Sequence, residues 1–221
     1  MNDSAKRIRI YVVDDHAVVT RGLRSAIQVE PDFEWAGAQA SADGLTEAHD
    51  THRPDIILLD IDMPGADAFV ELSDLTELRP EARVMMLTSS VRARYIDAAI
   101  ASGARGFIDK ATEFEDIFEA ARRVAAGELA FPDEVLARCE ERDGRLCLKD
   151  GGTSPLALLT PRESQVLRLI AQGNSTKEIA DQIHRSVKRI EAIRTSIMRK
   201  LGCSDRLELM RLAIREGIVD A

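Results

Sequence analysis

The arrangement of apolar runs in the N-terminal half constrains the fold more than any other feature of the sequence. Five short runs rich in aliphatic residues alternate with amphipathic stretches of helical length between residues 8 and 127. Several of these runs are apolar at nearly every position, which is typical of parallel strands covered on both faces. Five such strand–helix units predict an α/β doubly wound sheet of five parallel strands.

The predicted elements follow one another along the chain. The expected strands cover residues 8–15, 33–40, 55–61, 82–89 and 106–110. The expected helices cover residues 17–28, 43–51, 67–78, 94–102 and 113–126. Because open sheets of this class bind their ligands at the carboxyl ends of the strands, residues far apart in sequence are expected to converge there.

Polar side chains stand at four of these strand ends. Asp14 and Asp15 end the first strand, Asp60 the third, Thr88 the fourth and Lys110 the fifth. Three aspartates in one crevice repel one another unless a cation offsets their charge, and Mg²⁺ prefers such oxygen ligands. A metal ion and Lys110 would neutralise a phosphoryl group transferred to Asp60, with the Thr88 hydroxyl beside it. The pattern therefore predicts phosphoryl transfer to an aspartate.

The periodicity changes after residue 128. Residues 129–156 end in the turn-rich KDGGTSP, so we expect an interdomain linker there, with a short helix over 134–141. Four helical segments and no strand follow. Capping boxes in TPRE at 160–163 and STKE at 175–178 fix two helix starts. The predicted domains are 6–128 and a small all-α four-helix domain at 157–221, joined by the linker 129–156.

Charge is divided unequally between the two predicted domains. The 221-residue chain has a formal net charge of −8. From Thr160 onward there are 12 Lys and Arg against 8 Asp and Glu, a net of +4, which leaves −12 for residues 1–159. An acidic surface is repelled by phosphates, so only the C-terminal domain is suited to nucleic acid.

The third helix of this domain, expected over 187–201, has two distinct faces. Ile190, Ile193, Ile197 and Leu201 form an apolar stripe that is expected to be buried. The opposite face and its flanks hold the residues predicted to contact DNA: Lys188, Arg189, Glu191, Ala192, Arg194, Thr195, Arg199 and Lys200. Cations there would mainly hold phosphates, whereas Glu191, Ala192 and Thr195 are the expected readers of base edges.

Several segments resemble a known family. VVDDHAVVTRGL, LLDIDMPG, MMLTSS and GFIDK are similar to the motifs of response-regulator receiver domains. LTPRESQVLRLIAQGNSTKEIADQI, followed by MRKLG, resembles the LuxR-type helix-turn-helix output domain of the NarL/FixJ subfamily. The resemblance covers nearly the whole chain except the linker. It implies a flavodoxin-like receiver followed by a DNA-binding domain.

The resemblance assigns the metal and phosphate residues. It implies that Asp60 is the phosphoacceptor. It also implies that Mg²⁺ is bound by Asp15, Asp60 and the backbone carbonyl of Asp62, while Asp14 assists through water.

Further roles and partners follow from the same resemblance. Thr88 and Lys110 would contact the phosphoryl group, and Phe107 would be the aromatic switch. A sensor histidine kinase would supply the phosphoryl group. Phosphorylation would favour a homodimer on double-stranded DNA, with the helix at 206–216 as the dimerisation helix of the output domain.

The chain departs from the family's usual pattern at several positions. Ala68 stands where a glycine is usual, which would stiffen the loop beside the site. In the third helix of the output domain, Arg189 replaces a common Thr, Glu191 a frequent Lys and Ile193 a frequent His. Glu191 falls on the groove face, where its carboxylate is repelled by phosphates but can accept a hydrogen bond from cytosine N4. His16, after the acidic pair, is expected to be a helix-start residue.

Two alternatives stay open on the sequence alone. DID at 60–62 also matches the DxD motif of haloacid-dehalogenase-type phosphatases, which would make the chain an enzyme rather than a transcriptional regulator. Those enzymes take further metal carboxylates from a strand end after their lysine, whereas the acidic pair here precedes the nucleophile. The second alternative is a regulator that acts independently of phosphorylation.

The N-terminus does not resemble a targeting signal. Its first apolar run is cut short by two aspartates, and no small-residue cleavage site follows. No stretch approaches the roughly 18 apolar residues of a membrane span. We therefore expect a cytoplasmic protein with no membrane partner.

Overall fold

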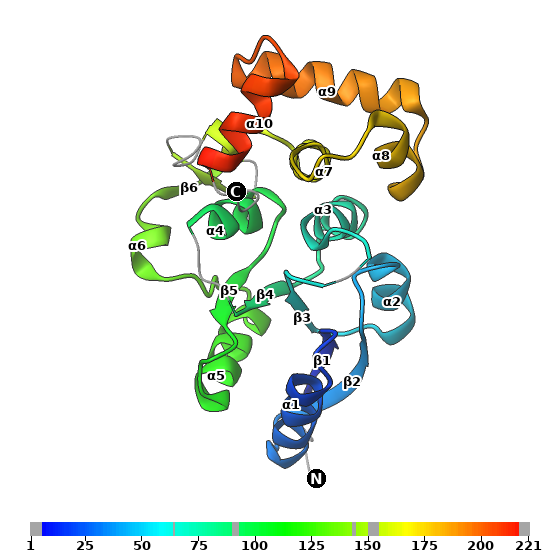
Figure 1. The fold of residues 1–221 in the computed structure, drawn as a ribbon. Helices are drawn as coiled ribbons and strands as arrows, with labels where there is room; N and C mark the ends of the chain where they lie inside the picture. The colour runs from blue at the N-terminus through cyan, green and yellow to red at the C-terminus, as the bar shows by residue number, and fades with distance from the viewer. Residues whose placement is uncertain (1–5, 64, 90–92, 143–144, 150–154, 217–221) are drawn as a thin grey trace. The chain divides into compact units, whose positions relative to one another are not determined.

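A five-stranded parallel sheet organises the first part of the chain (Figure 1). Its strands lie in the order β2-β1-β3-β4-β5. They are β1 (Ile8–Val13), β2 (Phe33–Gln39), β3 (Ile56–Asp60), β4 (Val84–Thr88) and β5 (Gly106–Asp109). Every residue of β3 and β4 is buried, which explains why these two segments are almost continuously apolar.

The computed structural model describes residues 6–63, 65–89, 93–142, 145–149 and 155–216. The chain divides into two compact units, Met1–Cys147 and Leu148–Ala221. Within the described ranges, no helix combines the length and the apolar character needed to cross a membrane.

Helices cover both faces of the sheet (Figure 1). One face carries α1 (Ala17–Val29) and α5 (Phe114–Ala125), and the other carries α2 (Leu45–His52), α3 (Ala68–Leu78) and α4 (Ala93–Ala101). Alternate strand residues pack against α1 and α5 in one buried cluster that includes Ile10, Val12, Ile56, Leu58, Met85 and Leu87. This confirms the doubly wound fold predicted from the sequence.

The strand order fixes where the functional side chains meet. The chain passes from β1 outward to β2 and then returns to β3 on the other side of β1, so the order reverses between β1 and β3. Such a switch point leaves a crevice at the carboxyl ends of the two strands. The strands end one or two residues earlier than predicted. Asp14 and Asp15 therefore lie just beyond β1, and Asp60 is the last residue of β3.

The predicted linker is more ordered than expected. Instead of a helix over 134–141, the structure has the shorter α6 (Asp133–Leu136). A two-stranded sheet follows it, formed by β6 (Cys139–Arg142) and β7 (Arg145–Leu148). The predicted helix was wrong beyond residue 136 because the chain gains sheet pairing there. Of the turn-rich segment 149–155, residues 150–154 lie outside the described residues.

The first part of the predicted linker, from Ala130 to Arg138, packs against the receiver sheet and its helix α4. Ala130 forms a parallel bridge with Gly106, and its carbonyl accepts a hydrogen bond of 3.0 Å from the Phe107 N–H. Arg138, beyond α6, pairs at 3.4 Å with the buried Asp97 of α4. The first unit therefore extends well into the segment predicted as linker.

The second unit is helical, as predicted. A short 3₁₀ helix η1 (Pro155–Leu158) precedes α7 (Pro161–Ala171), α8 (Thr176–Gln182), α9 (Val187–Leu201) and α10 (Arg206–Arg215). Both predicted capping boxes are present, and Ser186 caps α9. Gly202 ends α9 in the left-handed conformation at φ 67°, where glycine avoids a Cβ clash.

Candidate functional site

Asp60 lies at the centre of the crevice and is held in a defined orientation. Its side chain is only 2% exposed. Its Oδ1 accepts hydrogen bonds from the Ile61 N–H at 2.7 Å and the Asp62 N–H at 3.4 Å, so the turn after β3 positions this carboxylate. Its Oδ2 lies 2.7 Å from Lys110 Nζ. The sheet thus brings together two residues separated by 50 positions, as the sequence predicted.

Lys110 supplies the fixed positive charge of the site. Its backbone N–H donates to the Thr88 carbonyl at 2.7 Å, which extends the β4–β5 ladder to the edge of the crevice. Its ammonium lies 2.7 Å from Asp60 Oδ2 and 2.9 Å from Asp14 Oδ2. Burial alone would lower the pKa of Lys110, but the two carboxylates outweigh it and raise the pKa above its ordinary value. Lys110 therefore stays charged at neutral pH.

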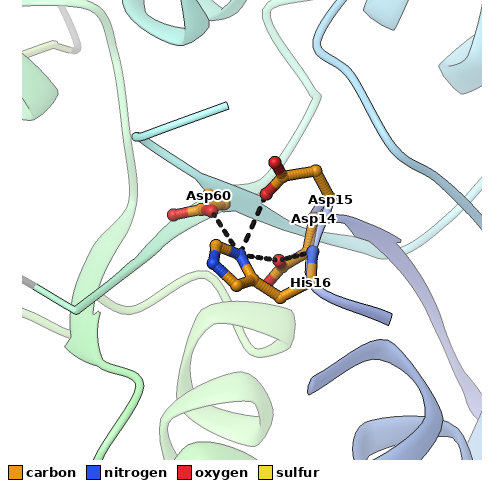
Figure 2. Close-up of side chains that lie close together, drawn as sticks. All are labelled: Asp14, Asp15, His16 and Asp60. Atoms are coloured by element: carbon orange, nitrogen blue, oxygen red, sulfur yellow. Dashed lines mark hydrogen bonds and ion pairs between the residues drawn. The ribbon is translucent and has the colours of Figure 1, made fainter. Parts of the chain in front are cut away.

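The acidic pair after β1 faces Asp60, with His16 between them (Figure 2). Asp14 is fully buried at its side chain, whereas that of Asp15 is 31% exposed. Nδ1 of His16 lies 3.1 Å from Asp14 Oδ1, 2.9 Å from Asp15 Oδ1 and 3.7 Å from Asp60 Oδ2. The sequence predicted the three carboxylates but treated His16 only as a helix-start residue. It is the N-cap position of α1 and also a member of the cluster.

The remaining predicted residues lie around this centre. Thr88 is fully buried as the last residue of β4, in register with Asp109 of β5. Phe107 is buried within β5, and its backbone pairs with the segment at Ala130. Asp62 is exposed two residues after Asp60. The structure therefore places Thr88 at the carboxyl end of β4 and Asp62 in the turn after β3.

The donor atoms of the crevice fit a divalent cation. One ligand atom from each of Asp14, Asp15, His16 and Asp60 lies within 4.8 Å of the others. Asp14 Oδ2 is buried and lies 2.9 Å from the Lys110 ammonium. Lys110 offsets only part of the negative charge of the three carboxylates, so a divalent cation beside them would be favourable. Oxygen donors at this spacing suit Mg²⁺.

Helix α9 of the second unit presents a polar face as predicted. Ile190 and Ile197 are buried, and Ile193 and Leu201 pack partly against the same core. Of the eight residues predicted to contact DNA, six are exposed: Lys188, Arg189, Glu191, Ala192, Thr195 and Arg199. Arg194 and Lys200 are half-buried. The cationic surface is therefore available along most of the helix.

Glu163 binds Lys200 in addition to capping α7, and the sequence indicated only the capping role. Glu163 closes the capping box of α7, where its Oε2 accepts a hydrogen bond from the Thr160 N–H at 2.8 Å. The same oxygen accepts from Lys200 Nζ at 2.6 Å, and its Oε1 accepts from Ser196 Oγ at 2.7 Å. Glu163 thus joins the start of α7 to the last turns of α9.

A sheet of this order, with an acidic triad and a lysine at its carboxyl edge, defines a receiver domain. Residues 10–122 match the profile of the response regulator receiver domain, and residues 157–213 match that of bacterial regulatory proteins of the luxR family. The chain belongs to the response regulators that combine these two domains. This membership selects a regulator over the phosphatase alternative.

Relatives match the chain over nearly its whole length. Response regulator protein VraR of Staphylococcus epidermidis is 32% identical over 213 residues, which cover 96% of this chain and 99% of that protein. VraR of Staphylococcus aureus is 30% identical over the same length. The solved structure of RcsB from Salmonella enterica serovar Typhimurium, bound to promoter rprA with the phosphomimetic BeF3⁻, matches with a TM-score of 0.65 at 23% identity. That match covers 94% of this chain and 98% of RcsB, and it shows likeness of fold.

Proposed function

We propose that this response regulator controls transcription through Mg²⁺-dependent phosphorylation of Asp60 by a sensor histidine kinase. Phosphorylation would promote a homodimer and binding to double-stranded DNA in the cytoplasm. The observation that carries the proposal is the buried Asp60 carboxylate, held by the turn after β3 and 2.7 Å from Lys110. The proposed functional boundaries are 6–128 for the receiver, 129–156 for a linker whose first part belongs to the same compact unit as the receiver, and 157–221 for the DNA-binding domain.

The chain's own groups account for the transfer. An Asp60 oxygen attacks phosphorus, so that an O–P bond forms while the bond from phosphorus to the donor's leaving group breaks and its electron pair departs with that group. Lys110 would turn from Asp60 to the transferred phosphoryl oxygens, and the Thr88 hydroxyl would contact another of them. Phe107 would follow the movement of Thr88.

The metal has a defined set of candidate ligands. Asp15, Asp60 and the Asp62 backbone carbonyl would bind Mg²⁺ directly, and Asp14 would act through water. When bound, Mg²⁺ neutralises charge on the phosphoryl group. The close approach of Asp14, Asp15 and Asp60 supports this assignment.

DNA binding is assigned to α9. Its exposed Lys188, Arg189 and Arg199 carry charge that attracts phosphates, and the luxR-family match covers this helix. The RcsB structure that matches this fold is described as bound to a promoter. Lys200 is the exception among the predicted contacts, because Glu163 holds its ammonium within the domain.

The full-length protein provides the direct test. DNA selected from a random pool is titrated before and after incubation with Mg²⁺ and a small acyl phosphate. We expect phosphorylation to tighten binding by about 5- to 150-fold, the usual size of coupling between two sites, and added salt to weaken it steeply. Equal affinity in both states would favour a regulator that acts without phosphorylation. Absence of binding to any duplex would contradict the assignment of α9.

Glu191→Gln is expected to relax the DNA sequence preference. The exposed Glu191 carboxylate is repelled by phosphates but can accept a hydrogen bond from cytosine N4. Its neutral variant should bind nonspecific DNA more tightly and lose about 1–3 kcal/mol of discrimination at one base pair. Randomised-site selection measures both effects. Lys188→Gln is the control, since loss of a phosphate contact should weaken binding equally on all sequences. Identical motifs from the parent and Glu191→Gln would make Glu191 a solvated charge.

A further inference from the structure

His16 occupies a position beside the carboxylates that its place as the N-cap residue of α1 does not require. Its Nδ1 lies 2.9 Å from Asp15 Oδ1 and 3.1 Å from Asp14 Oδ1, and it is 3.7 Å from Asp60 Oδ2 (Figure 2). The ring makes no hydrogen bond that caps α1. Its side chain is 59% exposed, so solvent and ions reach it.

The spacing of these atoms matches that of ligands around one metal ion. Two neighbouring ligands of an octahedral ion, each about 2.1 Å from the metal, are separated by about 3.0 Å. The 2.9 Å between His16 Nδ1 and Asp15 Oδ1, a direct ligand in the proposed site, is close to this value. The backbone also fixes the approach, because the His16 N–H donates to Asp14 Oδ1 at 2.8 Å. The imidazole is thus held on the same side of the crevice as the carboxylates.

The imidazole can present a lone pair in this position. Lys110 Nζ, a group with only N–H donors, lies 3.4 Å from the same Nδ1. With its proton on Nε2, the ring would offer Nδ1 either to that ammonium or to a metal. Imidazole nitrogen favours transition-metal ions, whereas Mg²⁺ favours oxygen donors. Mn²⁺ accepts carboxylates and imidazole together.

We propose that His16 is a nitrogen ligand of the divalent cation in this crevice and that it shifts the preference of the site from Mg²⁺ toward Mn²⁺. This proposal rests on the proposed function, because it concerns the cation that assists phosphorylation of Asp60. It adds a residue to the metal site and a second cation to those that the regulator would use.

Electron paramagnetic resonance of Mn²⁺ bound to the full-length protein tests the proposal. Pulsed measurements on the parent should show the ¹⁴N coupling of a coordinated imidazole. Competition with Mg²⁺ gives the ratio of the two affinities. In His16→Asn the ¹⁴N coupling should vanish and the preference for Mn²⁺ over Mg²⁺ should fall about tenfold, a size typical of changes at metal sites. Asn is a favourable N-cap residue, so α1 should keep its start.

His184→Asn is the matched control. His184 is exposed in the second unit and has φ 51°, a conformation that Asn adopts readily. This variant should keep both the ¹⁴N coupling and the Mn²⁺ preference. Mn²⁺ bound to the parent without ¹⁴N coupling, or an unchanged affinity ratio in His16→Asn, would overturn the role of His16 and leave the proposed function standing. No Mn²⁺ or Mg²⁺ binding to the parent would overturn both.

Discussion

Full-length protein carrying Asp60→Asn is expected to take up no phosphoryl group from a small acyl phosphate and Mg²⁺, whereas the parent takes up one. The reaction needs a carboxylate oxygen as nucleophile, and an amide in the same place is not nucleophilic enough to replace it. Asp60 is the buried carboxylate nearest to Lys110, at 2.7 Å. Intact-protein mass spectrometry counts the added groups. Loss of the added mass in base identifies an acyl phosphate.

Asp116→Asn provides the comparison for this experiment. Asp116 is an exposed carboxylate on the first turn of α5, and its variant should be phosphorylated like the parent. Both variants lose one carboxylate charge, so a difference in their phosphorylation must come from the position of the substituted residue. If Asp60→Asn gained a base-labile phosphoryl group as readily as the parent, another side chain would be the acceptor and the site would be assigned wrongly.

The fold was predictable because its pattern is periodic. Strands β3 and β4 are buried at every position, and this leaves a continuous apolar run that the sequence shows directly. The convergence of Asp14, Asp60 and Lys110 follows from parallel strands ending at one edge. Capping boxes likewise fixed the starts of α7 and α8 to the residue.

Features that depend on contacts between distant segments were not predictable in this way. The helix predicted over 134–141 failed for a different reason, because its last three residues join the local β6–β7 sheet. The contacts of the His16 ring with Asp14 and Asp15 depend on its side-chain rotamer. Sequence periodicity does not specify a rotamer. The bond between Glu163 and Lys200 spans 37 residues and follows from how α7 packs on α9.

Glu163→Ala is expected to destabilise the second unit strongly. The carboxylate is 9% exposed and accepts hydrogen bonds from Thr160, Ser196 and Lys200. Its removal leaves three donors without their acceptor, one of them a half-buried charge. A loss of about 2–3 kcal/mol is expected. Amide hydrogen exchange in α7 and α9 of the full-length protein should accelerate about 30- to 150-fold.

Glu178→Ala is the matched control for this substitution. Glu178 holds the same capping-box position in α8, where its Oε2 accepts from the Ser175 N–H at 2.7 Å, but it is exposed. Exchange in α7 and α9 should change much less in this variant. Equal acceleration in both variants would mean that Glu163 acts only as a capping residue and that its bonds to α9 contribute little.

The pH dependence of the stability of the second unit tests whether Glu163 stabilises α9 as well as capping α7. Burial alone would raise the pKa of Glu163, but hydrogen bonds from Lys200, Thr160 and Ser196 outweigh it and hold the pKa below its ordinary value of 4.5. A carboxyl whose pKa is lowered by folding contributes stability that is complete above its unfolded pKa and is lost as pH falls through the folded value. Exchange in α9 of the parent should therefore lose protection as pH falls below about 4.5. In Glu163→Gln this loss should be smaller, because the amide does not titrate. If the parent and Glu163→Gln had the same pH profile, Glu163 would have nearly the same pKa in the folded and unfolded chains. The hydrogen bonds from Lys200 and Ser196 of α9 would then not lower its pKa.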